Sequence, residues 1–186
     1  ITFLLFYSVT LCFIRISVQK RIYISYNPNS YREEELAFDL HSTGRKNGFM
    51  VNLPYRPSNS NNLTKQTESN INTSDWFLVF SIEPLSEMVR QEIEYALNNG
   101  KTMDQIIVVY SSHHGRNIPF EDNNRPIEMY VDDYDINSIE QFKEAVLNQI
   151  SERNNGHNIS NNNGLKTILG IGAAILLFRE ILRSND

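Results

Sequence analysis

Apolar and polar positions follow a repeating order through the middle of the chain. Short apolar runs, rich in β-branched and aromatic residues, lie at residues 21–26, 49–53, 76–80, 105–110 and 127–131. Each run has the length and composition of a strand. The segments between them place apolar residues at helical spacing, over residues 31–46, 63–72, 84–98 and 138–150. The pattern therefore predicts strands that alternate with helices.

This alternation has a consequence for the architecture. Successive strands that are joined through helices lie parallel in one sheet, with right-handed crossovers. The run WFLVF at residues 76–80 has no polar position, which is typical of a strand covered by helices on both faces. We therefore expect an α/β fold, a flavodoxin-like three-layer sandwich around a mainly parallel sheet of about five strands.

The two ends of the chain differ in character from the middle. We interpret residues 18–152, which have a mixed composition, as a single α/β domain, and the polar, Asn-rich residues 153–164 as a flexible linker. Residues 165–183 are apolar again and predict a C-terminal helix that contacts a membrane or a partner. Residues 1–17 are also apolar. We interpret them as upstream sequence read in frame, with the start near Val18, or as a membrane segment.

Composition narrows the classes of partner and cofactor. The 186-residue chain has a net charge of −5 and no basic stripe, so we expect no nucleic-acid partner. The one cysteine, Cys12, excludes an intramolecular disulfide and a Cys-based zinc site. A single cysteine favours the reducing setting of the cytoplasm. The protein would be membrane-associated there if residues 165–183 bind lipid. His113 and His114 have no carboxylate or cysteine at ligand spacing, and no phosphate-binding glycine motif occurs. We therefore expect neither a metal nor a resident cofactor.

Candidate chemistry lies where the predicted strands end. In an open parallel sheet, ligands bind beyond the carboxyl ends of the strands, where the strand order reverses. Residues that follow the first three strands or begin the next helix should converge there. They are Tyr26, Asn27, Tyr55, Arg56, Ser81 and Ser86. We expect them to bind or shape the site of a substrate.

Glu92 is the candidate catalytic residue. It lies in the first two turns of the helix predicted at residues 84–98, where a carboxylate facing the crevice would be partly desolvated and could stabilise positive charge in a substrate. The alternative is that Glu92 complements the helix dipole or pairs with a surface Lys or Arg. Composition alone favours that alternative, because Glu is common on helix surfaces.

Three segments are similar to the TIR (Toll/interleukin-1 receptor) domain family. RIYISY at residues 21–26 resembles the first conserved box, and INTSD at residues 71–75, followed by WFLVFS, resembles the family's approach to its third strand. SEMVRQEIEYALNNGK at residues 86–101, followed by QIIVVY, resembles the next helix and strand. The resemblance extends from residue 21 to residue 150, and it puts Glu92 at the position of the glutamate that NAD-cleaving TIR domains use.

Some residues depart from the family pattern. The turn after the first strand is Asn27-Pro28-Asn29-Ser30, where the family often has an Asp. Met88-Val89 stands in place of a Trp-Cys pair that often precedes the glutamate, so one usual aromatic wall for nicotinamide is missing. The loop after the second predicted strand also lacks the Arg-Asp and Pro-Gly pattern of animal adaptor TIR domains.

The resemblance implies a first hypothesis and leaves two others open. The first is an enzyme that cleaves the nicotinamide glycosidic bond of NAD, as substrate and not as cofactor, in a signalling or anti-phage defence pathway. The second is a non-catalytic TIR scaffold that self-associates and recruits protein partners. The third is an enzyme like the nucleoside deoxyribosyltransferases, which also use a carboxylate in a related sheet architecture.

Overall fold

The computed structural model describes residues 19–57, 62–116, 118 and 125–152. Its strands are β1 Arg21–Ser25, β2 Met50–Asn52, β3 Trp76–Ser81, β4 Ile106–Ser111 and β5 Ile127–Val131. Its helices are α1 Tyr31–Lys46, α2 Lys65–Thr73, α3 Glu87–Asn98 and α4 Ile136–Glu152, with a short 3₁₀ helix η1 at Met103–Gln105. Strands and helices alternate as the sequence pattern predicts.

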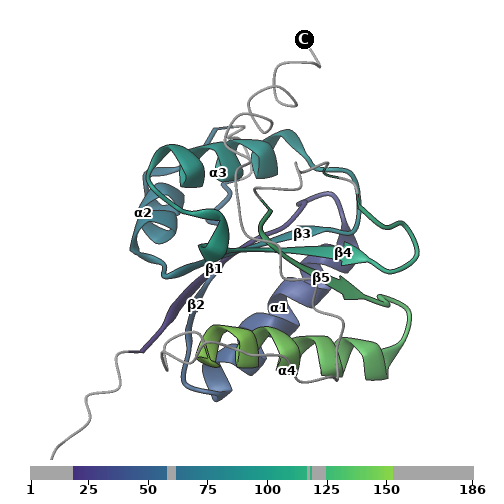
Figure 1. The fold of residues 1–186 in the computed structure, drawn as a ribbon. Coiled ribbons are helices and arrows are strands. Elements are labelled where there is room, and N and C mark those ends of the chain that lie inside the picture. The colour runs from purple at the N-terminus through teal and green to yellow at the C-terminus, as the bar shows by residue number, and fades with distance from the viewer. Residues whose placement is uncertain (1–18, 58–61, 117, 119–124, 153–186) are drawn as a thin grey trace, which may run out of the picture.

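The strands form one parallel sheet in the order β2-β1-β3-β4-β5. Helices α1 and α4 cover one face, and α2 and α3 cover the other (Figure 1). The predicted flavodoxin-like α/β sandwich is therefore confirmed. The strand order reverses between β1 and β3, because the chain first moves outward from β1 to β2 and then returns across β1 to β3.

The core has one apolar layer on each side of the sheet. Every residue of β3 and of β4 is buried, which explains why these two runs lack the polar alternation of a half-exposed strand. In β1 the alternation is visible, since Ile22 and Ile24 belong to the layer under α1 and α4 while Tyr23 belongs to the layer under α2 and α3. The ring of Tyr23 stacks on that of Phe77, with 5.4 Å between centroids.

Capping side chains set the helix starts. Helix α3 begins at Glu87 and not at residue 84 as the apolar spacing predicts, because Ser86 is its N-cap and accepts a hydrogen bond from the backbone N–H of Val89 at 3.3 Å. Ser30 caps α1 in the same way, through the N–H of Glu33 at 3.2 Å. Helix α4 is longer than predicted, by two residues at each end.

Several predictions concern residues outside the described part of the chain. These are the apolar segment at residues 1–17, the linker at residues 153–164 and the apolar helix at residues 165–183. Among the helices that the structure describes, none is both long and apolar enough to cross a membrane.

Gly44 lets α1 approach the edge of the sheet closely. A Cβ atom at this position would lie 2.6 Å from Cγ2 of Val51 in β2, well inside van der Waals contact. Glycine is therefore required here for packing, although it is a poor helix former.

Replacing Gly44 with Ala should destabilise the fold by about 1–3 kcal/mol, because overpacking outweighs a gain of roughly 1 kcal/mol in helix propensity. Urea unfolding of the purified variants would measure this. In a Val51→Ala background the same Gly44→Ala change should be neutral or stabilising, since the clash is removed. An equal loss in both backgrounds would contradict the packing explanation.

Candidate functional site

Glu92 lies in the second turn of α3 and is fully buried, with an exposed fraction of 0%. Its side chain contacts the carboxyl end of β1, where the hydroxyl of Ser25 donates a hydrogen bond to Oε2 at 2.5 Å. Nη2 of Arg56 lies 3.0 Å from Oε1 and forms an ion pair with it. The two carboxylate oxygens therefore have different partners, one from the sheet and one from the segment after β2.

Tyr23 and Ser25 reach Glu92 because of the strand period. Side chains two apart on β1 point to the same face of the sheet, and this face is covered by α3. The buried hydroxyl of Tyr23 lies beside Glu92 without a well-aligned hydrogen-bond partner among the described residues. Burial, and then the nearby charge of Glu92, raise the pKa of Tyr23.

Arg56 lies between Glu92 and the ring of Tyr26. The guanidinium carbon is 4.7 Å from the centroid of that ring, within the range of a cation–π contact. Both side chains are largely buried, with exposed fractions of 13% for Arg56 and 7% for Tyr26. The charged group of Arg56 thus has an anion at its edge and an aromatic face beneath it.

The charge state of Glu92 reflects two opposing effects. Burial is the larger effect and raises the pKa of Glu92 above its ordinary value, while the positive charge of Arg56 and the hydrogen bond from Ser25 offset part of this rise. A buried carboxylate without such partners would be protonated or would destabilise the fold. Arg56 is therefore the group that permits an anion to exist at this position.

A second buried carboxylate, Glu33, lies at the same end of the sheet. Its Oε2 accepts the backbone N–H of Asn27 at 2.6 Å, and its Oε1 accepts the N–H groups of Ile82 and Glu83 at 2.9 Å each. One side chain therefore joins the loop after β1 to the loop after β3, the two strands between which the strand order reverses. Burial raises the pKa of Glu33 to about 7, although the three N–H donors lower it.

Sequence reasoning missed Glu33, because its spacing has a local explanation. Ser30 and Glu33 have the spacing of a capping box, in which the Glu side chain returns to the N-cap backbone. Here the N–H of Ser30 instead donates to the carbonyl of Asn27 at 3.0 Å. The Glu33 carboxylate is thus available for the neighbouring loops. Tyr23 and Ser25 were also missed; the alternation of β1 is the feature that would have indicated them.

The other predicted site residues differ in what their side chains contact. Asn27 joins the two loops, because its side-chain amide donates to the carbonyl of Pro84 at 3.1 Å. Ser81 is fully buried at the end of β3. Ser86 is the N-cap of α3, so its hydroxyl is engaged with the helix. The Tyr55 side chain is exposed, while its backbone is bound to Thr67. Of the predicted set, Arg56 binds Glu92 directly, and Tyr26 contacts Arg56.

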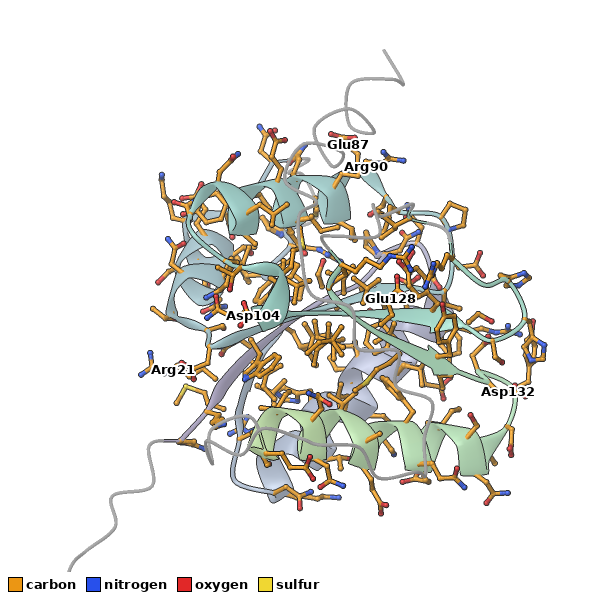
Figure 2. The ribbon with its side chains drawn as sticks, in the orientation of Figure 1. Arg21, Glu87, Arg90, Asp104, Glu128 and Asp132 are labelled. Atoms are coloured by element: carbon orange, nitrogen blue, oxygen red, sulfur yellow. The ribbon has the colours of Figure 1, made fainter. Side chains whose placement is uncertain are left out.

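An open depression adjoins this region. Its volume is about 640 Å³, within the range of small-molecule sites. It is lined by residues that follow β1 or β3: Asn27, Asn29, Ser30, Tyr31, Arg32, Glu83 and Pro84. Glu92 does not line the depression, and Asn27 is the residue common to it and to the predicted site. Figure 2 shows Glu87 and Arg90, also on α3, directed outward from the sheet.

His113 has a carboxylate partner that its local sequence did not indicate. Its Nε2 lies 2.9 Å from Oδ1 of Asp132, a residue beyond the carboxyl end of β5 (Figure 2). The hydrogen bond from His113 lowers the pKa of Asp132. Within the described ranges of the chain, no group of three or more His, Cys, Asp or Glu side chains is arranged to hold a metal ion.

Comparisons with known proteins identify no family. No family model matches the chain, and no curated protein matches it. A structure of the CMP N-glycosidase BcmB from Clostridium botulinum is similar, with 18% sequence identity and a TM-score of 0.43. The match covers 71% of this chain and 98% of that chain. The sequence identity and the TM-score are both low, so this likeness supports no conclusion about the site. Fold and site together define a doubly wound α/β protein with a buried carboxylate near its switch point.

The raised pKa of Glu33 predicts a pH-dependent stability. The folded protein should take up a proton between pH 4.5 and about 7 that the unfolded chain does not hold. Glu33 therefore contributes up to about 3 kcal/mol to the free energy of unfolding. This contribution is full below pH 4.5 and is lost as the pH rises through 7. Urea unfolding across this range, compared with Glu33→Gln, measures it. If the parent instead becomes more stable relative to Glu33→Gln as the pH rises, the N–H donors outweigh burial in setting the pKa of Glu33.

Proposed function

We propose that this protein cleaves the N-glycosidic bond between nicotinamide and ribose in NAD or a related nucleotide, with Glu92 as the catalytic residue, and that it belongs with the TIR-like enzymes its sequence resembles. The observation that carries this proposal is the setting of Glu92. It is a fully buried carboxylate at the carboxyl edge of a parallel sheet, bound by Ser25 and paired with Arg56.

The chemistry of the substrate fits one ionised carboxylate. In NAD the nicotinamide ring carries a positive charge, so it leaves as a neutral base when it takes the electron pair of the C1′–N bond. The positive charge then passes to the ribose, as an oxocarbenium-like species. Water adds at C1′ and releases a proton, which completes the hydrolysis. A carboxylate held beside C1′ stabilises the transition state most where this charge develops.

The position of Glu92 on rigid elements also supports a catalytic role. Ser25 is the last residue of β1 and pairs with Val79 of β3, a strand in the middle of the sheet. It holds Oε2 in place, and α3 holds the Glu92 backbone. A preorganised charge needs little reorganisation during reaction, which is the main source of electrostatic catalysis.

The burial of Glu92 also favours a second function. A carboxylate with no exposure, already paired with an arginine, has the features of a structural ion pair, as expected in a scaffold that binds proteins and does no chemistry. Incubation of the purified full chain with NAD, and separately with deoxynucleosides, distinguishes the hypotheses. Free nicotinamide supports the proposal, free nucleobase from deoxynucleosides supports a transferase-like enzyme, and no release supports the scaffold.

Replacing Glu92 with Gln should lower the rate of nicotinamide release by about 100-fold or more, the scale of losing one electrostatic stabiliser. Gln keeps the size of the side chain and one oxygen for Arg56, but it removes the negative charge. Because Arg56 loses its ion partner, stability will also fall, so rates must be measured well below the midpoint of thermal unfolding.

Glu94→Gln is the matched control for this experiment. Glu94 lies two residues further along α3, and its side chain is exposed. The same chemical change there should leave nicotinamide release within about twofold of the parent. Equal rates for the Glu92→Gln protein and the parent would exclude Glu92 as the catalytic residue.

A further inference from the structure

Glu92 is closed off from any substrate in this structure. No substrate atom can touch Glu92 while its exposed fraction is 0%. Of its neighbours, Ser25 and Tyr23 belong to a strand that pairs with β2 and with β3. Arg56 belongs to the irregular segment after β2 and reaches Glu92 only through its side chain. Arg56 is therefore the neighbour that can move away with the least disruption of the fold.

The hydrogen bonding of Arg56 is incomplete. Nη2 donates to Glu92, but Nε and Nη1 are buried and have no hydrogen-bond partner among the described residues. Buried polar groups are nearly always bonded, and an exception calls for an explanation. A guanidinium carries its N–H groups in a planar fork that matches the oxygens of a phosphate. The unused donors therefore suit an anionic ligand.

The contact with Tyr26 does not use these donors. The ring lies against the guanidinium, 4.7 Å from its central carbon, whereas the N–H groups point outward in the guanidinium plane. A cation–π contact can therefore persist when the partner at the edge changes. Tyr26 would hold Arg56 at the site during such an exchange.

Backbone groups nearby are already occupied. In doubly wound folds, N–H groups at the switch point commonly bind a ligand phosphate. Here the N–H groups of Asn27, Ile82 and Glu83 all donate to Glu33. A phosphate group that enters between these loops would have to displace a buried carboxylate that belongs to the protein itself. A side-chain cation is the better receptor.

We propose that Arg56 recognises a phosphate group of the substrate by exchanging its ion pair with Glu92 for one with the phosphate, which uncovers Glu92 for the ribose. The inference rests on the proposed function for the role of Glu92, but the recognition of phosphate by Arg56 can be tested without turnover. It makes the site selective for nucleotides over nucleosides, and it makes binding of the anion the event that opens the site.

The test compares two probes that differ in one phosphate, nicotinamide mononucleotide and nicotinamide riboside. Their dissociation constants are measured by calorimetry on the full chain carrying Glu92→Gln, which removes turnover and avoids an unpaired carboxylate when Arg56 is changed. With Arg56 present, the mononucleotide should bind at least about 10-fold more tightly. Adding Arg56→Gln should bring the ratio close to one, and Arg56→Lys should give an intermediate value, because it keeps the charge without the fork.

Each outcome decides one of the two proposals. A ratio near one with Arg56 present, or a ratio unchanged by Arg56→Gln, would overturn phosphate recognition even if the parent releases nicotinamide. An Arg56-dependent preference in a protein that releases no nicotinamide would keep the inference and overturn the proposed function. Thermal unfolding of each variant verifies that the binding was measured on folded protein.

Discussion

The carboxylate of Glu33 fixes the geometry of the region where β1 and β3 end. Without it, one N–H group in the loop after β1 and two in the loop after β3 would lose their acceptor, because all three donate to this one carboxylate. The position of Asn27, and through it the rim of the open depression, follows from this bond set. The relative position of the loops after β1 and β3 depends on that junction.

The two buried carboxylates are stabilised by different kinds of donor. Glu33 is bound by backbone N–H groups, which are fixed dipoles and cannot leave without unfolding a loop. Glu92 is bound by a hydroxyl and by a long cationic side chain, which can rotate. The first arrangement suits a permanent structural role, and the second suits a group that must change partners during function.

The sequence predicted the architecture well, because the signal was strong and local. The unbroken apolar runs of β3 and β4 and the turn residues between elements required only short-range patterns. Errors were confined to the ends of elements, as at α3, where the cap Ser86 and not the apolar spacing sets the start. Such boundaries depend on single hydrogen bonds, which hydrophobic periodicity does not report.

The site was predicted less completely, for reasons that are also physical. Composition alone favoured a helix-surface role for Glu92, and the family resemblance was needed to single it out. The Glu92–Arg56 pair joins residues 36 positions apart, and no local pattern encodes such a contact. Glu33 was hidden because its spacing from Ser30 imitates a capping box. Ser25 was missed because the alternation of β1, which puts Tyr23 and Ser25 on one face of the sheet, does not show what that face contacts.

The shortness of β2 has a consequence for the energetics of the site. This strand has three residues, pairs on one side with β1 and forms an edge of the sheet. Edge elements with few bonds have the lowest free energy of local opening in a folded protein. Arg56 follows this strand by four positions, so fraying of the edge would release the arginine while β1, β3 and β4 remain paired. This edge of the sheet is thus close in sequence to the buried Arg56–Glu92 ion pair, and hydrogen exchange at β2 would report how often the edge opens.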